Sequence, residues 1–266
     1  MCQKHVSPLV RVTEKPEAGH RRSIVLSVRV SLLADPSHFI SALLHFARQH
    51  CDAEVLPLLI SEQHYYGCMN ALRMRLGENM AKGALSENEP GRILGAAAEL
   101  VVQQFLQNML VSLRGETAQI ELLREKPGTT VSLNGEYRLK FTTLYNCELY
   151  HGDTLITEFD ALVINPQGMH IIDVCASRVR VHEKLTNRRQ HYSDVSRAFA
   201  VPGNTFHLET VHILTESGVA GTVEQANGFV VSLPLFRQVV QVSEAFCAGR
   251  AQGGFHTFVQ HLSSRG

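Results

Sequence analysis

Two aspartates stand on either side of a turn-forming sequence near the middle of the chain. Residues 165–168 (Asn-Pro-Gln-Gly) have strong turn chemistry and separate two apolar runs, so this stretch predicts a β-hairpin. If Ile164 faces Met169 across the turn, antiparallel pairing sets Asp160 opposite Asp173. Directly opposed carboxylates repel each other, which disfavours the pairing unless a cation or a shared proton compensates. The spacing therefore indicates a cation site.

The face on which these side chains lie follows from strand geometry. Side chains alternate between the two faces of a strand, so Glu158, Asp160, Asp173 and Cys175 would all project from one side. A register shifted by one residue would instead send the two aspartates to opposite faces. We favour the metal-site interpretation and keep the shifted register as the alternative.

A basic segment follows the hairpin directly. A helix from about His182 to Phe199 fits Leu185, Tyr192, Val195 and Phe199 as its buried stripe. Lys184, Arg188 and His191 would share another face. That face is either a phosphate-facing surface or an ordinary solvated helix surface. The basic residues of the segment are Arg178, Arg180, Lys184, Arg188 and Arg189, against the single acid Glu183.

Composition restricts the classes to which the protein can belong. The chain has 266 residues, 44% of them hydrophobic and 19% charged, which is enough to bury a core and excludes a disordered chain. Its 25 basic residues balance 25 acidic ones, so any attraction to nucleic acid must come from a local patch. The six cysteines form no Cys-x-x-Cys pair, and neither a signal segment nor a membrane span is recognisable. We expect reduced thiols and a cytoplasmic location.

The first part of the chain predicts a small layer of alternating strands and helices. Residues 1–23 look like a loose arm, and Ser23–Leu33 is rich in strand-forming residues. Asp35-Pro36 is typical of a helix start, and apolar spacing extends that helix to about His50. A strand at Glu54–Ile60 and a helical stretch at Ser61–Gly83 complete a βαβα layer with parallel strands.

The polar sequence at Ser86 marks the expected domain boundary. We expect an N-terminal subdomain at residues 1–86, a larger α/β domain at 87–250, and a poorly specified tail at 251–266. Nothing before residue 86 resembles a ligand-binding motif, which disfavours a sensor in which the first unit binds a small ligand.

The next elements would position the third acid of the candidate site. A helix from Arg92 to Leu113 carries Glu99 off its apolar stripe, in line with Gln103. Spacing alone favours a solvated role for Glu99. The apolar stripe itself contains Ile93, Ala97, Val101, Phe105 and Met109.

A second hairpin is expected just before the acidic one. Residues 136–150 are strand-like, and Tyr150 facing Leu155 would set Cys147 beside Glu158. Cys147 and Cys175 would then share a row two strands apart, beyond disulfide reach. The remaining predicted elements are strands at Phe206–Leu214 and Gly228–Leu233 and a helix at Pro234–Cys247.

This order of elements resembles the PD-(D/E)XK nuclease superfamily, and residues 91–216 resemble its NERD (nuclease-related) domain. The resemblance covers about half of the chain and implies a restriction-endonuclease-like core, with a central mixed sheet flanked by helices. The matching motifs are Gly95-Ala-Ala-Ala-Glu99, Glu158-Phe-Asp160, Ile171-Ile-Asp173-Val-Cys175 and Asn187-Arg-Arg-Gln190. The second glycine of the family's helix motif is replaced by Ala98.

The resemblance also implies a set of site residues. Glu99, Asp160 and Asp173, with the Val174 carbonyl, would hold Mg²⁺ or Mn²⁺, which prefer oxygen ligands. The family's lysine follows the second acid by two residues, where this chain has Cys175, and a mostly neutral thiol cannot replace an ammonium group. The nearest substitutes are Lys184 and Arg178. The residues expected to contact nucleic acid are Arg178, Arg180, Lys184, Arg188, Arg189 and Gln190.

The sequence therefore predicts a nuclease-fold protein that acts on or binds DNA or RNA. Its metal-dependent phosphodiesterase site would be degenerate because Cys175 replaces the lysine. An active metal-dependent nuclease would need Lys184 or Arg178 to reach the acids from elsewhere. The alternative is a catalytically inactive fold that serves as a module for binding a protein partner or for assembly.

Overall fold

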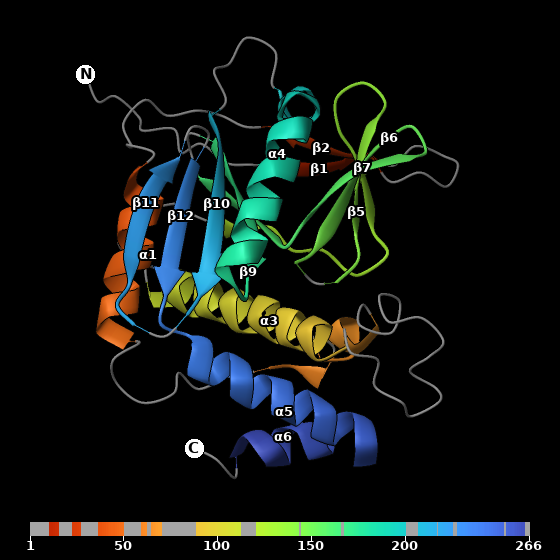
Figure 1. The fold of residues 1–266 in the computed structure, drawn as a ribbon. Coiled ribbons are helices and arrows are strands. Elements are labelled where there is room, and N and C mark those ends of the chain that lie inside the picture. Colours follow the sequence, from red (N-terminus) through yellow and green to blue (C-terminus); the bar gives the residue numbers. More distant parts are fainter. Residues whose placement is uncertain are drawn as a thin grey trace, which may run out of the picture.

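The computed structural model describes most of the chain from residue 89 onward and separate parts of the N-terminal region. The described residues are 11–15, 23–27, 37–50, 60–62, 65–70, 89–112, 121–143, 145–165, 168–200, 207–216, 218–225, 228–252 and 254–263. They form an α/β structure with one mixed and one antiparallel main sheet, flanked by helices (Figure 1). None of the described helices is long and apolar enough to span a membrane.

The larger sheet has six strands and mixed direction. Strands β9, β10 and β12 run parallel, whereas β8 is antiparallel to β9 and β11 to β12. β3 pairs antiparallel with β8 at the far edge. In spatial order the strands are β11 (Gly221–Gln225), β12 (Gly228–Leu233), β10 (His207–Thr215), β9 (Gly168–Cys175), β8 (Ala161–Asn165) and β3 (Glu121–Leu122).

The smaller sheet is an antiparallel meander of four strands beside the larger one (Figure 1). Its last strand leads directly into β8 of the larger sheet, so residue 160 lies where the chain passes from one sheet to the other. The strands are β4 (Thr130–Ser132), β5 (Tyr137–Phe141), β6 (Cys147–His151) and β7 (Thr154–Phe159).

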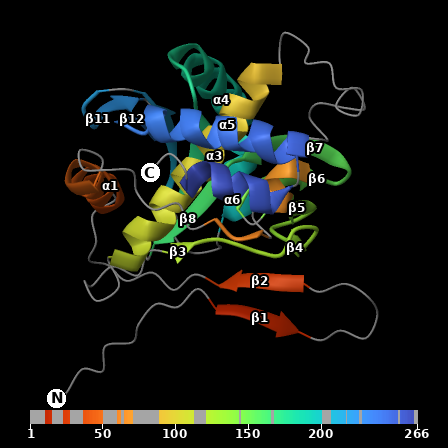
Figure 2. The same ribbon diagram turned by 90° about the horizontal axis from the view of Figure 1, so that it is seen from below.

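Helices cover both faces of the six-stranded sheet. Helix α3 packs in one apolar cluster with Ala161, Ile172 and Val211, so it covers the face to which these residues point. Helix α4 covers the opposite face, where its Val195 packs with Ile171. Helix α5 packs against α3, and α6 packs against the side of α5 away from α3 (Figures 1 and 2). The helices are α1 (Ser37–His50), α3 (Glu89–Ser112), α4 (Arg178–Phe199), α5 (Phe236–Gln252) and α6 (Phe255–Ser263).

Helix α3 is buried more completely than its predicted stripe suggests. All five residues of that stripe are buried, but so are Ala96, Ala98, Leu100 and Leu106 on other sides of the helix. The small alanine side chains let neighbouring elements approach the helix backbone closely. This placement fixes Glu99 and Gln103 beside the sheets.

The predicted acidic hairpin is confirmed with its register from Ala161 onward, but Glu158 pairs with Glu148 in the small sheet and is not part of this hairpin. Ile164 pairs with Met169, and Tyr150 pairs with Leu155 in the preceding hairpin. The helices predicted to end near His50 and to begin near Arg92 are also present, as α1 and α3.

Two details of the register are wrong. The pairing shifts between Leu149 and Tyr150, so Cys147 faces Phe159 rather than Glu158. Because β7 and β8 belong to different sheets, Cys147 and Cys175 do not share a row, although both remain thiols as expected. An alternating sequence does not show where a strand changes sheets, since both sheets impose the same period of two.

Several other boundaries differ from the predictions. The expected loose arm contains β1 (Arg11–Lys15), which pairs antiparallel with β2 (Ser23–Ser27). Residues 136–150 form two strands, and α4 begins at Arg178 rather than His182. The tail contains α6, whose Phe258 is buried against Tyr65 and Phe246. Strands β3, β4 and β11 were not predicted.

Part of the predicted N-terminal organisation cannot be compared with the structure. Most of the strand expected at Glu54–Ile60, most of the helix at Ser61–Gly83 and the boundary at Ser86 lie outside the described residues. Helix α1 contributes Phe39 and Leu43 to the same apolar cluster as α3.

We expect Gly228→Ala to lower the free energy of unfolding by more than about 4 kcal/mol, because a methyl group cannot fit there. Gly228 pairs with Thr210, has φ of +149°, and a Cβ atom would lie 1.8 Å from the Thr210 carbonyl oxygen. Gly218→Ala is a matched control, since Gly218 has φ of +130° and a Cβ atom added there would meet nothing within 4 Å. Thermal or urea unfolding that shows equal losses for both variants would contradict the close approach.

Candidate functional site

Asp160 lies at the bend where the chain leaves the small sheet and enters the large one. β7 ends at Phe159 and β8 begins at Ala161. The backbone N–H of Asp160 donates to the Ile172 carbonyl at 3.1 Å, while its carboxylate oxygen Oδ2 accepts from the Val174 N–H at 2.6 Å. The carboxylate thus takes the place of a backbone acceptor and continues the pairing with β9 beyond the end of β8.

Asp173 lies near the end of β9, on the face that α4 covers. Arg188 of α4 binds its carboxylate with two nitrogens, Nε to Oδ2 at 3.1 Å and Nη2 to Oδ1 at 2.5 Å. Such a two-point contact fixes the orientation of both groups. Lys184 of the same helix contacts Asp160, so both aspartates lie on the α4 side, as the hairpin register predicts.

Arg188 also connects α4 to the small sheet. Its Nη1 donates to Thr157 Oγ1 and its Nη2 to the Glu158 carbonyl, both at 2.9 Å. The guanidinium carbon lies 4.7 Å from the centre of the Phe159 ring. Arg188 is only 6% exposed. The expectation that it shares a solvated or phosphate-facing side with Lys184 and His191 is therefore wrong, because this side of the helix meets the buried acids.

Lys184 lies one turn before Arg188 and reaches the other aspartate. Its Nζ forms an ion pair with Asp160 Oδ2 and donates to the Val174 carbonyl at 2.9 Å. These are two of the oxygen ligands that the family resemblance assigns to a metal ion. The ammonium group therefore occupies the position between oxygens where a cation was expected.

The charges of the site stabilise one another. Burial opposes the charged form of Lys184, but the attraction of Asp160, Asp173 and Glu99 outweighs it and raises the pKa of Lys184 above its usual value. Burial likewise acts to raise the pKa of Asp173, but Arg188 and Lys184 outweigh it and hold that pKa below its usual value. Lys184 therefore stays protonated and Asp173 stays ionised at neutral pH.

Glu99 is connected to Asp160 indirectly. The Asn146 side-chain amide donates to Glu99 Oε2 at 2.8 Å, and the Asn146 side-chain oxygen accepts from Gln103. Gln103 also donates to the Asp160 carbonyl at 2.8 Å. Within the described ranges, no three His, Cys, Asp or Glu side chains converge as a metal-binding group. Glu99 is thus linked to the backbone of Asp160 through the side-chain amides of Asn146 and Gln103.

His212 is a further neighbour of the acids that sequence reasoning missed. It pairs in register with Asp173 from β10, is buried, and places Nδ1 3.5 Å from Asp173 Oδ2. Burial lowers the pKa of His212 by more than Asp173 raises it. The sequence did contain an indication of this role. His212 is a histidine within an apolar strand, and the alternation of side chains in β10 places it on the face that α4 covers. Asn146 and Gln103 were also missed as site residues, although both are polar residues within largely apolar segments.

The other predicted residues are spread along α4 and beside it. Arg178 is exposed and paired with Glu216, with its Nε 3.2 Å from Glu216 Oε2, and Arg180 lies in the first turn of the helix. Arg189 and Gln190 are exposed. Cys175 is buried in an apolar cluster, so no charge stands at the position of the family's lysine.

Comparison with known proteins gives no family assignment for this chain. No protein-family model matches it, and no curated protein is significantly similar in sequence. The structure itself establishes an α/β fold in which two ion pairs join α4 to the bend at Asp160 and to the end of β9.

We expect Arg188→Ala to lower the free energy of unfolding by about 3–5 kcal/mol, because it leaves the Asp173 carboxylate buried without its charge partner. Urea unfolding measures this loss. Arg189→Ala is the matched control, because Arg189 is the exposed neighbour and its loss should change stability by no more than about 0.5 kcal/mol. Similar small effects for both variants would show that the Arg188–Asp173 contact does not support the fold.

The lowered pKa of Asp173 predicts how stability falls in acid. A carboxyl group with a lowered pKa in the folded state adds stability above its unfolded value of about 3.9, and this stability is lost as pH falls through the folded pKa. Wild type should therefore lose stability steeply below about pH 4, whereas Asp173→Asn, although less stable at pH 7, should show a shallower fall. Asp153→Asn alters a fully exposed carboxylate and should keep the wild-type slope. Unfolding measured from pH 7 to pH 2 tests the difference.

Proposed function

We propose that this protein has a restriction-endonuclease-like fold of the NERD type and acts on DNA or RNA. The order of elements supports the proposal. A helix with Glu99 precedes a hairpin with Asp160 and Asp173, and α4 then leads into β10, parallel to β9. Helices on both faces of a mixed sheet are in keeping with that core. In this proposal residues 1–86 are an N-terminal subdomain.

The observation that carries the proposal is the position of the Lys184 ammonium group. It reaches the Asp160 carboxylate and the Val174 carbonyl from α4, within hydrogen-bonding distance of both. Cys175 cannot supply a positive charge from β9, because a thiol is either neutral or negative. Its side chain packs with Val181 and Leu214. Lys184 thus brings the basic group to the aspartates from a helix instead of from the strand.

The oxygen atoms present fit a hard divalent cation in chemical type. Asp160, Asp173 and the Val174 carbonyl would hold Mg²⁺ or Mn²⁺, with Glu99 near by. Such an ion, when bound, polarises a phosphate oxygen and lowers the pKa of an attacking water. Arg188 would keep the Asp173 carboxylate in a fixed orientation. Lys184, released from Asp160, would place its ammonium group against the negative charge that develops on the phosphate.

Metal-dependent cleavage tests the proposal directly. We expect the wild type to cleave single- or double-stranded DNA or RNA with Mg²⁺ or Mn²⁺, and Lys184→Ala and Asp160→Asn each to lower the rate at least about 100-fold. Lys140→Ala is the matched control, because Lys140 lies on the small sheet near Glu148 and is about half exposed. This variant should cleave as wild type does. Gel assays of labelled substrates, with thermal unfolding to verify folding, provide the readout. Cleavage that persists in Lys184→Ala would show that this lysine is not the basic group.

A second candidate function rests on the two ion pairs themselves. Lys184 already neutralises Asp160, and Arg188 already holds both oxygens of Asp173. A site neutralised in this way suits a protein that binds nucleic acid or a protein partner without cutting. Salt-dependent binding to DNA or RNA, with no cleavage under any divalent cation, would establish this second function and contradict the first.

A further inference from the structure

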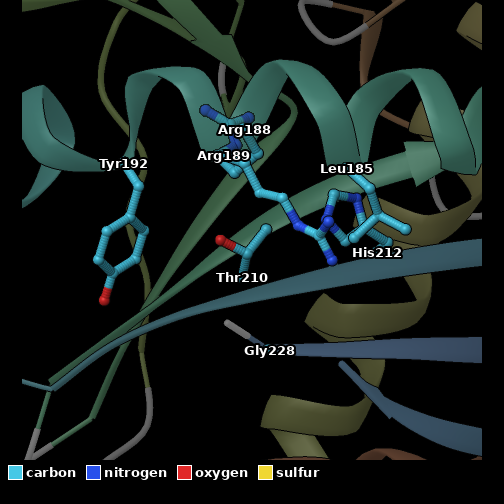
Figure 3. Close-up of a pocket in the computed structure, with 7 residues that line it drawn as sticks. All are labelled: Leu185, Arg188, Arg189, Tyr192, Thr210, His212 and Gly228. Carbon is cyan, nitrogen blue, oxygen red and sulfur yellow. The ribbon is translucent and has the colours of Figure 1, made fainter. Parts of the chain in front are cut away.

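A small pocket lies between α4 and the large sheet, next to the acidic site. Figure 3 shows side chains of α4 on one side of it and Thr210 and His212 of β10 on the other, with Gly228 on the neighbouring strand. The pocket adjoins Asp173 directly, because Arg188 and His212 contact that carboxylate as well as lining the pocket. Its lining residues are Leu185, Arg188, Arg189, Tyr192, Thr210, His212 and Gly228.

The floor of the pocket carries polar atoms that the protein leaves unsatisfied. Thr210 is 2% exposed and His212 1% exposed. Among the described residues, Thr210 Oγ1 has no hydrogen-bond partner, and His212 Nδ1 makes no hydrogen bond although it lies 3.5 Å from Asp173 Oδ2. A buried donor or acceptor without a partner costs about 1–3 kcal/mol, so such atoms usually meet water or a ligand. Gly228 has no side chain to cover this floor.

The mouth of the pocket has a different chemistry. Leu185, Arg189 and Tyr192 lie on one face of α4, at helical spacing. Tyr192 is half-buried, and its hydroxyl donates to the Leu208 carbonyl at 3.4 Å, which orients the ring. An aromatic ring, an apolar side chain and an exposed guanidinium group are the features on which a planar base stacks.

We propose that this pocket binds a single unpaired nucleobase, which stacks on Tyr192 and directs its polar edge at Thr210 and His212. The inference rests on the proposed function, since it names the part of the substrate that lies beside Asp173. A base has both an apolar face and a hydrogen-bonding edge, as the pocket requires. The pocket is narrow and open on one side, so the ring of the base would lie across its opening against Tyr192. Its enclosed floor has room for about one water molecule, so only the edge of the base reaches it.

Binding of short oligonucleotides in the presence of EDTA, measured by fluorescence anisotropy, tests the inference without cleavage. A single strand should bind at least about 5-fold more tightly than an abasic strand of equal length. Tyr192→Ala should weaken binding of the single strand about 5- to 150-fold, whereas Tyr192→Phe keeps the ring, loses only the contact with Leu208, and should restore most of the affinity. Thr210→Val should weaken binding about 2- to 12-fold without lowering the melting temperature, because it removes an unsatisfied buried hydroxyl group. Thr222→Val, which alters an exposed threonine of β11, is the matched control.

Two results with oligonucleotides would overturn the inference while the proposed function stands. One is equal binding of the normal and abasic strands. The other is wild-type binding by Tyr192→Ala in a protein that cleaves or binds nucleic acid. Competition with small phosphates gives a further test. If inorganic phosphate and ribose 5-phosphate displace a bound nucleoside monophosphate equally well, the pocket is an anion site, and the inference is overturned.

Nucleoside monophosphates separate the two claims in the other direction. Suppose that the protein neither cleaves nor binds oligonucleotides, but binds mononucleotides and loses that binding in Tyr192→Ala. This result would support the pocket and contradict the proposed function. Absence of binding to every one of these probes would contradict both.

Discussion

The structure depends on the neutralisation of two carboxylates that the fold places against one helix. Asp160 and Asp173 are both nearly buried, and a buried charge without a partner would destabilise the protein by several kcal/mol. Lys184 and Arg188 supply the opposite charges from successive turns of α4. Because Arg188 also contacts Thr157 and Phe159, the same helix fixes the angle between the two sheets. One set of contacts therefore determines where α4 lies, how the chain bends at Asp160 and how the two sheets are oriented to each other.

The sequence predicts the local geometry of this region well. Residues 165–168 permit a tight connection, and the period of two then fixes Ile164 against Met169, so the two acids fall on one face. The sequence does not predict that β7 and β8 belong to different sheets, because Phe159, Asp160 and Ala161 alternate as in one continuous strand. The sheet change depends on contacts made by distant elements, among them Gln103 with the Asp160 carbonyl.

The inward orientation of α4 was harder to predict for a related reason. Spacing shows that Lys184 and Arg188 share a side of the helix but not what that side meets. Basic residues usually face water, and only the burial of two acids beneath the helix reverses this preference. The two candidates for the basic group differ in a similar way. Both were candidates from their distance along the chain, but Lys184 contacts Asp160 and Val174, whereas Arg178 pairs with Glu216.

The Lys184 ammonium group is attached to the protein, so it competes for the site at a high effective concentration that dilution cannot reduce. Any cation from solution must first displace it from Asp160 and the Val174 carbonyl, and its apparent affinity is weakened accordingly. Displacement also releases a positive charge that can meet an anion. By thermodynamic reciprocity, an anion that captures the released lysine would tighten the binding of the cation to the same degree. In the proposed function, the single side chain of Lys184 would thereby link the binding of two oppositely charged ligands.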